Sequence, residues 1–414
     1  MADRGVVDGF CDAGFAGVRR AFEDNFVDHG EVGAAVTVIV RGETVVDLLG
    51  GWADAEQRVP WSADTLVNAY SVGKAFLALL ALREVEAGRI GLDDPVAAHW
   101  PAFAAAGKGA TTVRHALAHR AGVPAIREPL VDDDLWDFDR MCDAVAATAP
   151  WWEPGERHAY HTNTYGHLVG GLLRHATGDL PGTLLARVAG PLDADVHWGL
   201  ADTDLARCAR VVWAGPEPDR PDEPDRSGGG DRSDGRASAT PDADADDEAR
   251  MVLLGYVNPP GYSSIGVVNS EAWRRAQIPS TNGHMSARGI ARMYAAIADG
   301  RLLDPGLLAE AVRPQSQGPC PVLGQDVTFG LGFQPWTAAR PFGRTPAGFG
   351  HYGTGGSLGY ADPSLGVAFG YVMNHVVPRW QSPRNRALVD AVHAALAGAG
   401  GAAGAGGAGG TGSR

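Results

Sequence analysis

The chain has 414 residues, of which 45% are hydrophobic and 20% charged, so it is long enough to bury a substantial core. Its formal net charge of −14 argues against nucleic acid as a partner. The cysteines show no C-x-x-C spacing, which favours reduced thiols over a disulfide framework or a zinc site; they are Cys11, Cys142, Cys208 and Cys320. The sequence shows neither a secretory signal nor an apolar run of membrane-spanning length, so we expect a cytoplasmic protein with no membrane partner.

Helices and strands are predicted from the spacing of apolar residues. Residues 12–28 carry apolar side chains at helical spacing, and residues 33–49 are rich in β-branched residues and interrupted at Arg41-Gly42, the pattern of a hairpin. Residues 66–82 have a short polar start followed by an apolar run that is too hydrophobic for a surface helix, which indicates a buried helix. Further helices are predicted over 83–91, 112–118, 165–176, 286–300 and 384–397, and strands over 329–333, 348–351 and 366–373.

Strands at both ends with helices between them predict an α+β fold in a single domain, residues 12–396. One lobe is expected from about 12–70 and 281–396, with a helical lobe from about 71–280 inserted. Residues 216–250 hold twelve acidic residues and five arginines but no Val, Ile, Leu or aromatic residue, which predicts a disordered acidic insert. The Gly- and Ala-rich segment 397–414 is expected to be a disordered tail.

Ser71-Val-Gly-Lys74 opens the buried helix. A spacing of three residues on a helix places the Ser71 and Lys74 side chains on one face, as a nucleophile and its proton acceptor require. The alternative is a serine that only caps the helix. A lysine in the first turn opposes the helix dipole, which favours a catalytic function for Lys74.

Tyr160 lies in a turn and polar-aromatic segment, residues 154–166, that opens another predicted helix. We expect it to be a second proton carrier. Its phenol has an ordinary pKa near 10, so a phenolate at neutral pH requires ~4 kcal/mol of stabilisation, which is available only if Tyr160 meets Lys74 in a dry cleft. The alternative is a core tyrosine with a satisfied hydroxyl.

The third segment is rich in glycine, residues 348–359, and contains His351-Tyr352-Gly353-Thr354. Glycines in a strand indicate that another group approaches the backbone closely, and we expect a substrate acyl group there. The backbone N–H of Thr354 and that of Ser71 would then form an oxyanion hole, worth ~3 kcal/mol per donor.

Taken together, the three segments resemble the penicillin-recognising serine hydrolases: class C β-lactamases, DD-peptidases and β-lactamase-like carboxylesterases. The resemblance covers about residues 12–396. It implies a β-lactamase/transpeptidase-like fold, an antiparallel sheet flanked by N- and C-terminal helices with an inserted helical lobe. It also implies that Ser71 is acylated, that Lys74 and Tyr160 relay protons, and that His351, Tyr352 and Gly353 line the pocket.

Two positions depart from the family pattern. Thr162 stands where the family's Tyr-x-Asn motif has asparagine, and Asn163 follows one residue later. His351 replaces a lysine that helps bind a substrate carboxylate, and neutral imidazole attracts an anion less than ammonium does. Both changes resemble the esterase branch. We therefore expect a serine hydrolase that cleaves small-molecule carboxylic esters without metal or cofactor.

Several alternatives remain open. An acyltransferase, or an amide hydrolase of the β-lactamase or D-aminopeptidase type, would use the same fold, and a catalytically silent scaffold or binding protein would keep the fold alone. Gly355-Gly-Ser357-Leu-Gly359 matches the G-x-S-x-G elbow of α/β-hydrolases. His115 and His119 are spaced as zinc ligands on a helix, but the H-E-x-x-H glutamate is missing. Four tryptophans are candidates to line an apolar pocket or to pack between lobes: Trp151, Trp152, Trp213 and Trp336.

Overall fold

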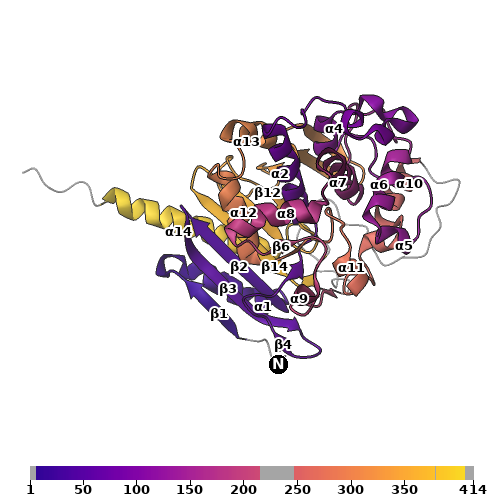
Figure 1. Ribbon diagram of the computed structural model, residues 1–414. Helices are drawn as coiled ribbons and strands as arrows, with labels where there is room; N and C mark the ends of the chain where they lie inside the picture. The colour runs from indigo at the N-terminus through magenta and orange to yellow at the C-terminus, as the bar shows by residue number, and fades with distance from the viewer. Residues whose placement is uncertain (1–5, 215–246, 378, 406–414) are drawn as a thin grey trace, which may run out of the picture.

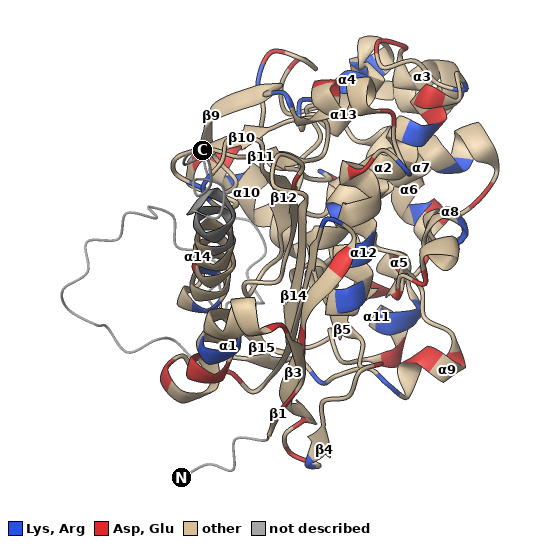
Figure 2. Cartoon of the chain, turned by 90° about the vertical axis from the view of Figure 1, so that its left-hand side faces the viewer, with Lys and Arg blue, Asp and Glu red and all other residues tan. Residues whose placement is uncertain are grey.

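The computed structural model describes residues 6–214, 247–377 and 379–405, with side chains described as far as residue 398. A β-sheet forms the centre of one lobe, and helices cover both of its faces (Figures 1 and 2). A predominantly helical lobe lies beside it, to the right in Figure 1. This is the β-lactamase/transpeptidase-like α+β fold predicted from the sequence.

The main sheet is antiparallel and joins the two ends of the chain. Its strands run in the order β1-β3-β2-β14-β13-β12-β11, with β4 paired to β3. The predicted hairpin is confirmed as β2 and β3, turning at Arg41 and Gly42, both at positive φ. β14 pairs with β2 along its whole length, which joins the N-terminal and C-terminal strands into one sheet. The strand bounds are β1 Val7–Cys11, β2 Gly33–Val40, β3 Glu43–Asp54, β4 Val59–Pro60, β11 Gln334–Pro335, β12 Phe349–Tyr352, β13 Leu358–Asp362 and β14 Val367–Met373.

One face of this sheet is covered by α12 (Ala287–Ala298), which packs on β2, β13 and β14. Ser286 caps its N-terminus by accepting from the Gly289 amide, as the predicted Ser start requires. Glycine is needed beneath this helix because a Cβ on Gly359 would lie 2.3 Å from the Tyr294 ring. The space above this glycine is therefore filled by the protein's own helix.

The opposite face is covered by α1 (Ala16–Asp28) and α14 (Pro383–Ala405), which pack against each other (Figure 2). Arg384, only 2% exposed, ties α14 to the N-terminal segment. Its guanidinium pairs with Glu31 at 3.1 Å and donates to the carbonyls of His29 and His375. A buried charge is tolerated only when it is paired and hydrogen-bonded in this way.

The helical lobe is arranged around α2 (Val72–Glu86), whose side chains are nearly all buried. α2 packs against α7 (Thr164–Thr177) and α8 (Pro181–Ala189). Small sheets connect the lobes: β5 (Val67–Asn68), β8 (His284–Met285) and β6 (Val196–His197) form one, β9 (Ser316–Cys320) and β10 (Gln325–Phe329) another, and β7 (Val212–Trp213) and β15 (His375–Val376) a third. The other helices are α3 Val96–His99, α4 Val113–Leu117, α5 Asp132–Leu135, α6 Phe138–Ala147, α9 Asp202–Leu205, α10 Asp247–Val257, α11 Glu271–Arg275 and α13 Pro305–Val312.

Some predicted boundaries were wrong. β1 precedes residue 12, the expected start of the domain. The strand predicted over 329–333 ends at Phe329, because the chain turns at Gly330 and Gly332 is at φ 77°. β13, Leu358–Asp362, was not among the predicted strands.

The predicted disordered segments fall largely outside the described residues. Of the acidic insert, residues 216–246 lie outside them, and residues 247–250 belong to α10 instead. Of the tail, residues 397–405 continue α14, and residues 406–414 lie outside. Extending an existing helix avoids the cost of nucleation, and the alanines in this segment have the highest helix propensity.

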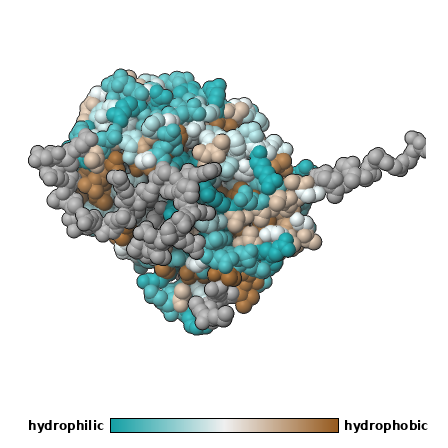
Figure 3. All heavy atoms as spheres, turned by 180° about the vertical axis from the view of Figure 1, so that it is seen from behind, coloured by the Kyte–Doolittle hydropathy of each residue, from teal (hydrophilic) through white to brown (hydrophobic). Residues whose placement is uncertain are grey.

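Within the part of the chain that the structure describes, no helix is both long and apolar enough to cross a membrane. Seen from behind, the molecule shows hydrophobic side chains in patches between hydrophilic regions (Figure 3).

Candidate active site

Ser71 stands at the first turn of α2, immediately after a strained residue. Tyr70 has a φ of 51°, a left-handed conformation that costs a non-glycine residue roughly 1–2 kcal/mol. The Ser71 side chain makes no helix-capping hydrogen bond. Its Oγ lies instead 3.0 Å from the Nζ of Lys74. The structure therefore contradicts the capping interpretation and supports the spacing argument for Ser71 and Lys74.

Lys74 is completely buried. Its Nζ donates to the Ser280 carbonyl at 2.7 Å and lies 4.8 Å from the centre of the Tyr160 ring. Burial holds the pKa of Lys74 well below its usual value, because the ammonium form would be cut off from water. A neutral amine beside a serine hydroxyl is a competent proton acceptor.

Tyr160 is 1% exposed and sits in an aromatic cluster. Its ring stacks on Phe329 at 5.3 Å and meets the edge of Trp380 at 5.2 Å. Its hydroxyl has no hydrogen-bond partner among the described residues, so it is not the satisfied core tyrosine of the alternative interpretation. Burial raises the pKa of Tyr160 well above its usual value, an effect that the neighbouring Ser71 hydroxyl opposes. Tyr160 and Lys74 meet in a buried site as required, but the resting form of Tyr160 is the phenol.

Asn163 does not present a free amide to the site. Its Nδ2 donates to the Gly255 carbonyl of α10 at 2.8 Å, and its Oδ1 accepts from the Thr281 hydroxyl at 2.7 Å. Its backbone carbonyl accepts from the Ser280 hydroxyl at 2.6 Å. Ser280 is the residue whose own carbonyl holds Lys74. Asn163 thus supports the position of Lys74 rather than facing a substrate.

His351 lies on β12, with its ring 6.3 Å from that of Tyr160 and 6.3 Å from that of Trp380. Its Nδ1 is 2.7 Å from the Tyr352 carbonyl, which can only accept, so Nδ1 carries the proton and Nε2 is a bare acceptor. Nε2 is buried and has no partner in the described chain. Burial, assisted by Lys74, lowers the pKa of His351 to about 3, which keeps the ring neutral.

The three residues after His351 differ in their surroundings. The Tyr352 side chain points away, stacking on Phe342 at 5.1 Å, so its prediction as a pocket residue was wrong: alternate side chains of a strand face opposite sides. Gly353 packs against the backbone that precedes Ser71, where a Cβ would lie 2.3 Å from the Ala69 carbonyl oxygen. The close approach predicted for a substrate at this glycine is made by the protein chain. The Thr354 and Ser71 amides donate to no backbone carbonyl within the described residues.

The chain that carries this serine, buried lysine and buried tyrosine is similar to known proteins in sequence and in fold. The sequence profile of the Beta-lactamase family matches residues 18–394. The chain belongs to the beta-lactamase family. It is 35% identical over 401 residues to the esterase/beta-lactamase LipL of Mycobacterium tuberculosis, with 94% of this chain and 86% of LipL covered.

Two solved structures support the same family assignment. A penicillin-binding protein homologue from Caulobacter crescentus is 35% identical, with a TM-score of 0.81 and coverage of 94% of this chain and 100% of that chain. A family VIII carboxylesterase is 33% identical, with a TM-score of 0.82 and the same coverage. This beta-lactamase family protein is a serine hydrolase, as the sequence predicted.

Neither rival catalytic centre is supported in this family member. Ser357 lies between β12 and β13, so the strand-to-helix turn of a G-x-S-x-G elbow is absent at this position. α4 ends at Leu117, and His119 has left the helix with a φ of 60°, so it does not share a helical face with His115. No group of three or more potential metal-ligating His, Cys, Asp or Glu side chains occurs among the described residues.

His119 and Trp380 are site residues that the sequence did not identify. The His119 ring lies 4.9 Å from that of Tyr160, and its Nδ1 accepts from the His161 amide at 3.2 Å. Trp380 lies against both Tyr160 and His351. From the sequence, His119 was considered only as a candidate zinc ligand, and Trp380 was not singled out.

The predicted tryptophans have separate environments. Trp152 belongs to the apolar cluster around Tyr160, with Trp151 packed at its edge. Trp213 meets the ring of Tyr70 at 6.3 Å. Trp336 packs against the main core and donates to the Gly343 carbonyl. Of the four, Trp152 is the one buried in the cluster that holds Tyr160.

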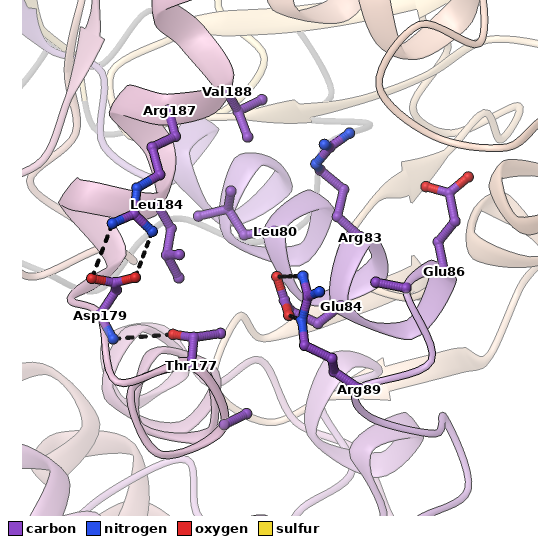
Figure 4. Close-up of a pocket in the computed structure, with 12 residues that line it drawn as sticks. Leu80, Arg83, Glu84, Glu86, Arg89, Thr177, Asp179, Leu184, Arg187 and Val188 are labelled. Carbon is purple, nitrogen blue, oxygen red and sulfur yellow. Dashed lines mark hydrogen bonds and ion pairs between the residues drawn. The ribbon is translucent and has the colours of Figure 1, made fainter.

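A pocket of about 540 Å³ lies at the C-terminal end of α2, away from Ser71 at its N-terminal end (Figure 4). Four of its charged groups pair with one another: Arg89 binds Glu84, and Arg187 binds Asp179 at 2.5 Å. The other two are bonded to backbone groups, Arg83 to the Leu302 carbonyl and Glu86 to the Asp304 amide. This pairing leaves the pocket little unsatisfied charge to recognise an ionic ligand.

Proposed function

We propose that this hydrolase cleaves carboxylic esters through an acyl-enzyme formed on Ser71. The observation that carries the proposal is the 3.0 Å contact between Ser71 Oγ and the Nζ of a fully buried lysine whose pKa is lowered by burial. The esterase names of LipL and of the family VIII carboxylesterase support esters as the substrate class. A base within hydrogen-bond distance of the serine hydroxyl is what acylation by an ester requires.

In the acylation step, Lys74 Nζ accepts the Ser71 proton while Oγ bonds to the ester carbonyl carbon. The carbonyl oxygen becomes an oxyanion and accepts hydrogen bonds from the Ser71 and Thr354 amides. The bond to the alcohol oxygen then breaks, and the leaving oxygen takes a proton from the Tyr160 hydroxyl. Lys74 returns its proton to Tyr160, which leaves both groups neutral and the acyl group on Ser71.

Deacylation repeats these steps with water in place of the alcohol. Tyr160 accepts a proton from the attacking water as its own proton passes to Lys74, and the proton finally returns to Ser71. The apolar cluster that surrounds Tyr160 contributes Trp152, Met251 and Leu254 as a wall for the non-polar part of the substrate.

The test is an intact-mass measurement after mixing the protein with a panel of acyl esters and a cephalosporin. Addition of an acyl mass in wild type but not in Ser71→Ala supports the proposal, and Ser357→Ala is the matched control that should acylate normally. A mass increase only with the cephalosporin would assign the site to β-lactams instead. Loss of acylation in Ser357→Ala alone would refute Ser71 as the nucleophile.

A further inference from the structure

A second pocket, of about 260 Å³, lies between the β9–β10 hairpin and the segment that follows β11. Its lining includes Gln317, Asp326, Thr328, Gln334 and Arg340. Unlike the pocket in Figure 4, it contains polar groups that have no partners within the described chain. Two of these groups point to one kind of ligand.

Arg340 is a partly buried cation without a counterion. No carboxylate in the described chain lies within ion-pair distance of its guanidinium, whereas other partly buried arginines such as Arg114 and Arg207 each have two. Burial lowers the pKa of Arg340, as expected for a desolvated cation that is not paired. Its guanidinium lies 5.2 Å from the Trp380 ring centre, which holds it in place without neutralising it.

Gln334, which lines the same pocket, supplies a fixed donor. The side chain is 4% exposed, and its Oε1 accepts from the Tyr352 amide at 3.4 Å. Because a backbone N–H can only donate, this bond fixes the orientation of the amide and directs Nε2 elsewhere. Nε2 is buried and has no acceptor among the described residues. A buried N–H₂ group without an acceptor is costly and calls for a ligand.

The pocket adjoins the catalytic residues. β10 lines it with Val327 and Thr328, and the next residue, Phe329, stacks on Tyr160. On the other side, Trp380 lies between the Arg340 guanidinium and the rings of Tyr160 and His351. One aromatic side chain, Trp380, therefore contacts both the guanidinium in the pocket lining and the rings of the proposed catalytic site.

Asp326 is the acidic residue in the lining, and it is exposed. It is not within ion-pair distance of Arg340, so it leaves the guanidinium available, although its charge reduces the attraction for an anion.

We propose that this pocket is a subsite for a carboxylate carried by the ester substrate, bound by the Arg340 guanidinium and the Gln334 amide. The inference rests on the proposed ester hydrolysis and deepens it. His351 cannot attract an anion from β12, because its ring is neutral and presents a lone pair. Arg340 supplies a permanent positive charge from a different element, and its planar fork matches a carboxylate.

The experiment compares charged and neutral esters of matched shape. One pair is mono-4-nitrophenyl adipate and 4-nitrophenyl hexanoate, with the carboxylate on the acyl side. The other is 4-acetoxybenzoate and its methyl ester, with the carboxylate on the alcohol side. The quantity measured is the ratio of kcat/KM for the charged ester to that for the neutral one, after subtraction of uncatalysed hydrolysis.

Arg340→Gln is expected to lower this ratio about tenfold or more in at least one pair, chiefly through KM. Arg340→Lys should retain part of the preference, and Asp326→Asn should raise it. Arg344→Gln removes the same charge from an exposed residue nearby and is the matched control. An equal rate of Ser71 labelling by a fluorophosphonate in all variants shows that the catalytic centre is intact. Equal ratios in wild type and Arg340→Gln for both pairs would overturn the subsite.

Failure of the ester proposal is distinguishable from failure of the subsite. If wild type hydrolyses none of the four esters, the proposed function is wrong, and the subsite is tested by thermal shift with adipate dianion. Stabilisation of wild type and Arg344→Gln but not of Arg340→Gln would still support an anion site. No stabilisation of wild type, or equal stabilisation of Arg340→Gln, would refute it.

Discussion

The lowered pKa of Lys74 predicts the pH profile of the hydrolase. An ordinary lysine, with a pKa of about 10.4, is neutral in only about 1 of 2,500 molecules at pH 7. If Lys74 titrated in this way, kcat/KM would rise tenfold per pH unit up to about pH 10. Burial lowers the pKa of Lys74 well below that value, so the profile should level off well below pH 10. Activity should be lost as the pH falls through the pKa of Lys74, because the ammonium has no lone pair.

The assay is kcat/KM for 4-nitrophenyl hexanoate from pH 5 to 10, with spontaneous hydrolysis subtracted. The ester does not titrate in this range, so the acid limb reports the free enzyme. Lys74→Arg keeps a positive charge on the helix but remains protonated, and we expect it to lose at least about 10²-fold in kcat without regaining activity at high pH. A wild-type profile that still rises tenfold per unit at pH 9, or a near-normal kcat for the Lys74→Arg variant, would refute the reasoning.

Three further variants test the groups around this pair. Tyr160→Phe should reduce kcat about 10²-fold for an alkyl ester but much less for a 4-nitrophenyl ester, whose leaving group needs no proton, and parallel assays of both esters measure the difference. Asn163→Ala removes the hydrogen bonds to Gly255 of α10 and to Thr281, so kcat should fall with little change in KM, and the acid limb of the pH profile should shift. An unchanged acid limb would show that Asn163 contributes only to the stability of the fold. Lys108, fully buried, donates to three carbonyls at 2.6 to 2.9 Å, so Lys108→Met should lower the free energy of unfolding in urea by about 3 kcal/mol without changing KM.

Local sequence signals predicted the parts of the molecule that depend on local spacing. Lys74 follows Ser71 by three positions, and helix geometry alone brings their side chains together. The hairpin was predicted in the same way, because the β-branched residues on either side of Arg41-Gly42 are neighbours in the sequence. β1 was missed because the side chains of Val7 to Cys11 do not alternate between buried and exposed, as those of a predictable strand would. The segment is a strand because it pairs with β3. Its hydrogen-bond partners, rather than its own residues, make it a strand.

The remaining site residues come from segments far apart in the sequence. Phe329 and Trp380 contact Tyr160 across 169 and 220 positions, and no spacing rule connects them. Glycines were informative in another way. Gly353 correctly signalled a close approach, but sequence alone could not tell a substrate from the Ala69 backbone, which occupies that space.

Desolvation accounts for the proposed proton relay better than attraction between Lys74 and Tyr160 does. The sequence hypothesis required Lys74 to stabilise a Tyr160 phenolate, which needs a charged ammonium. Burial shifts the pKa of Lys74 down and that of Tyr160 up, and both shifts favour the uncharged amine and phenol, the base and the acid that the proposed mechanism needs. His351 is neutral for the same reason. Because these three groups carry no charge, the developing oxyanion depends on fixed N–H dipoles, and attraction for an anionic substrate depends on a cation outside them, the position that Arg340 occupies.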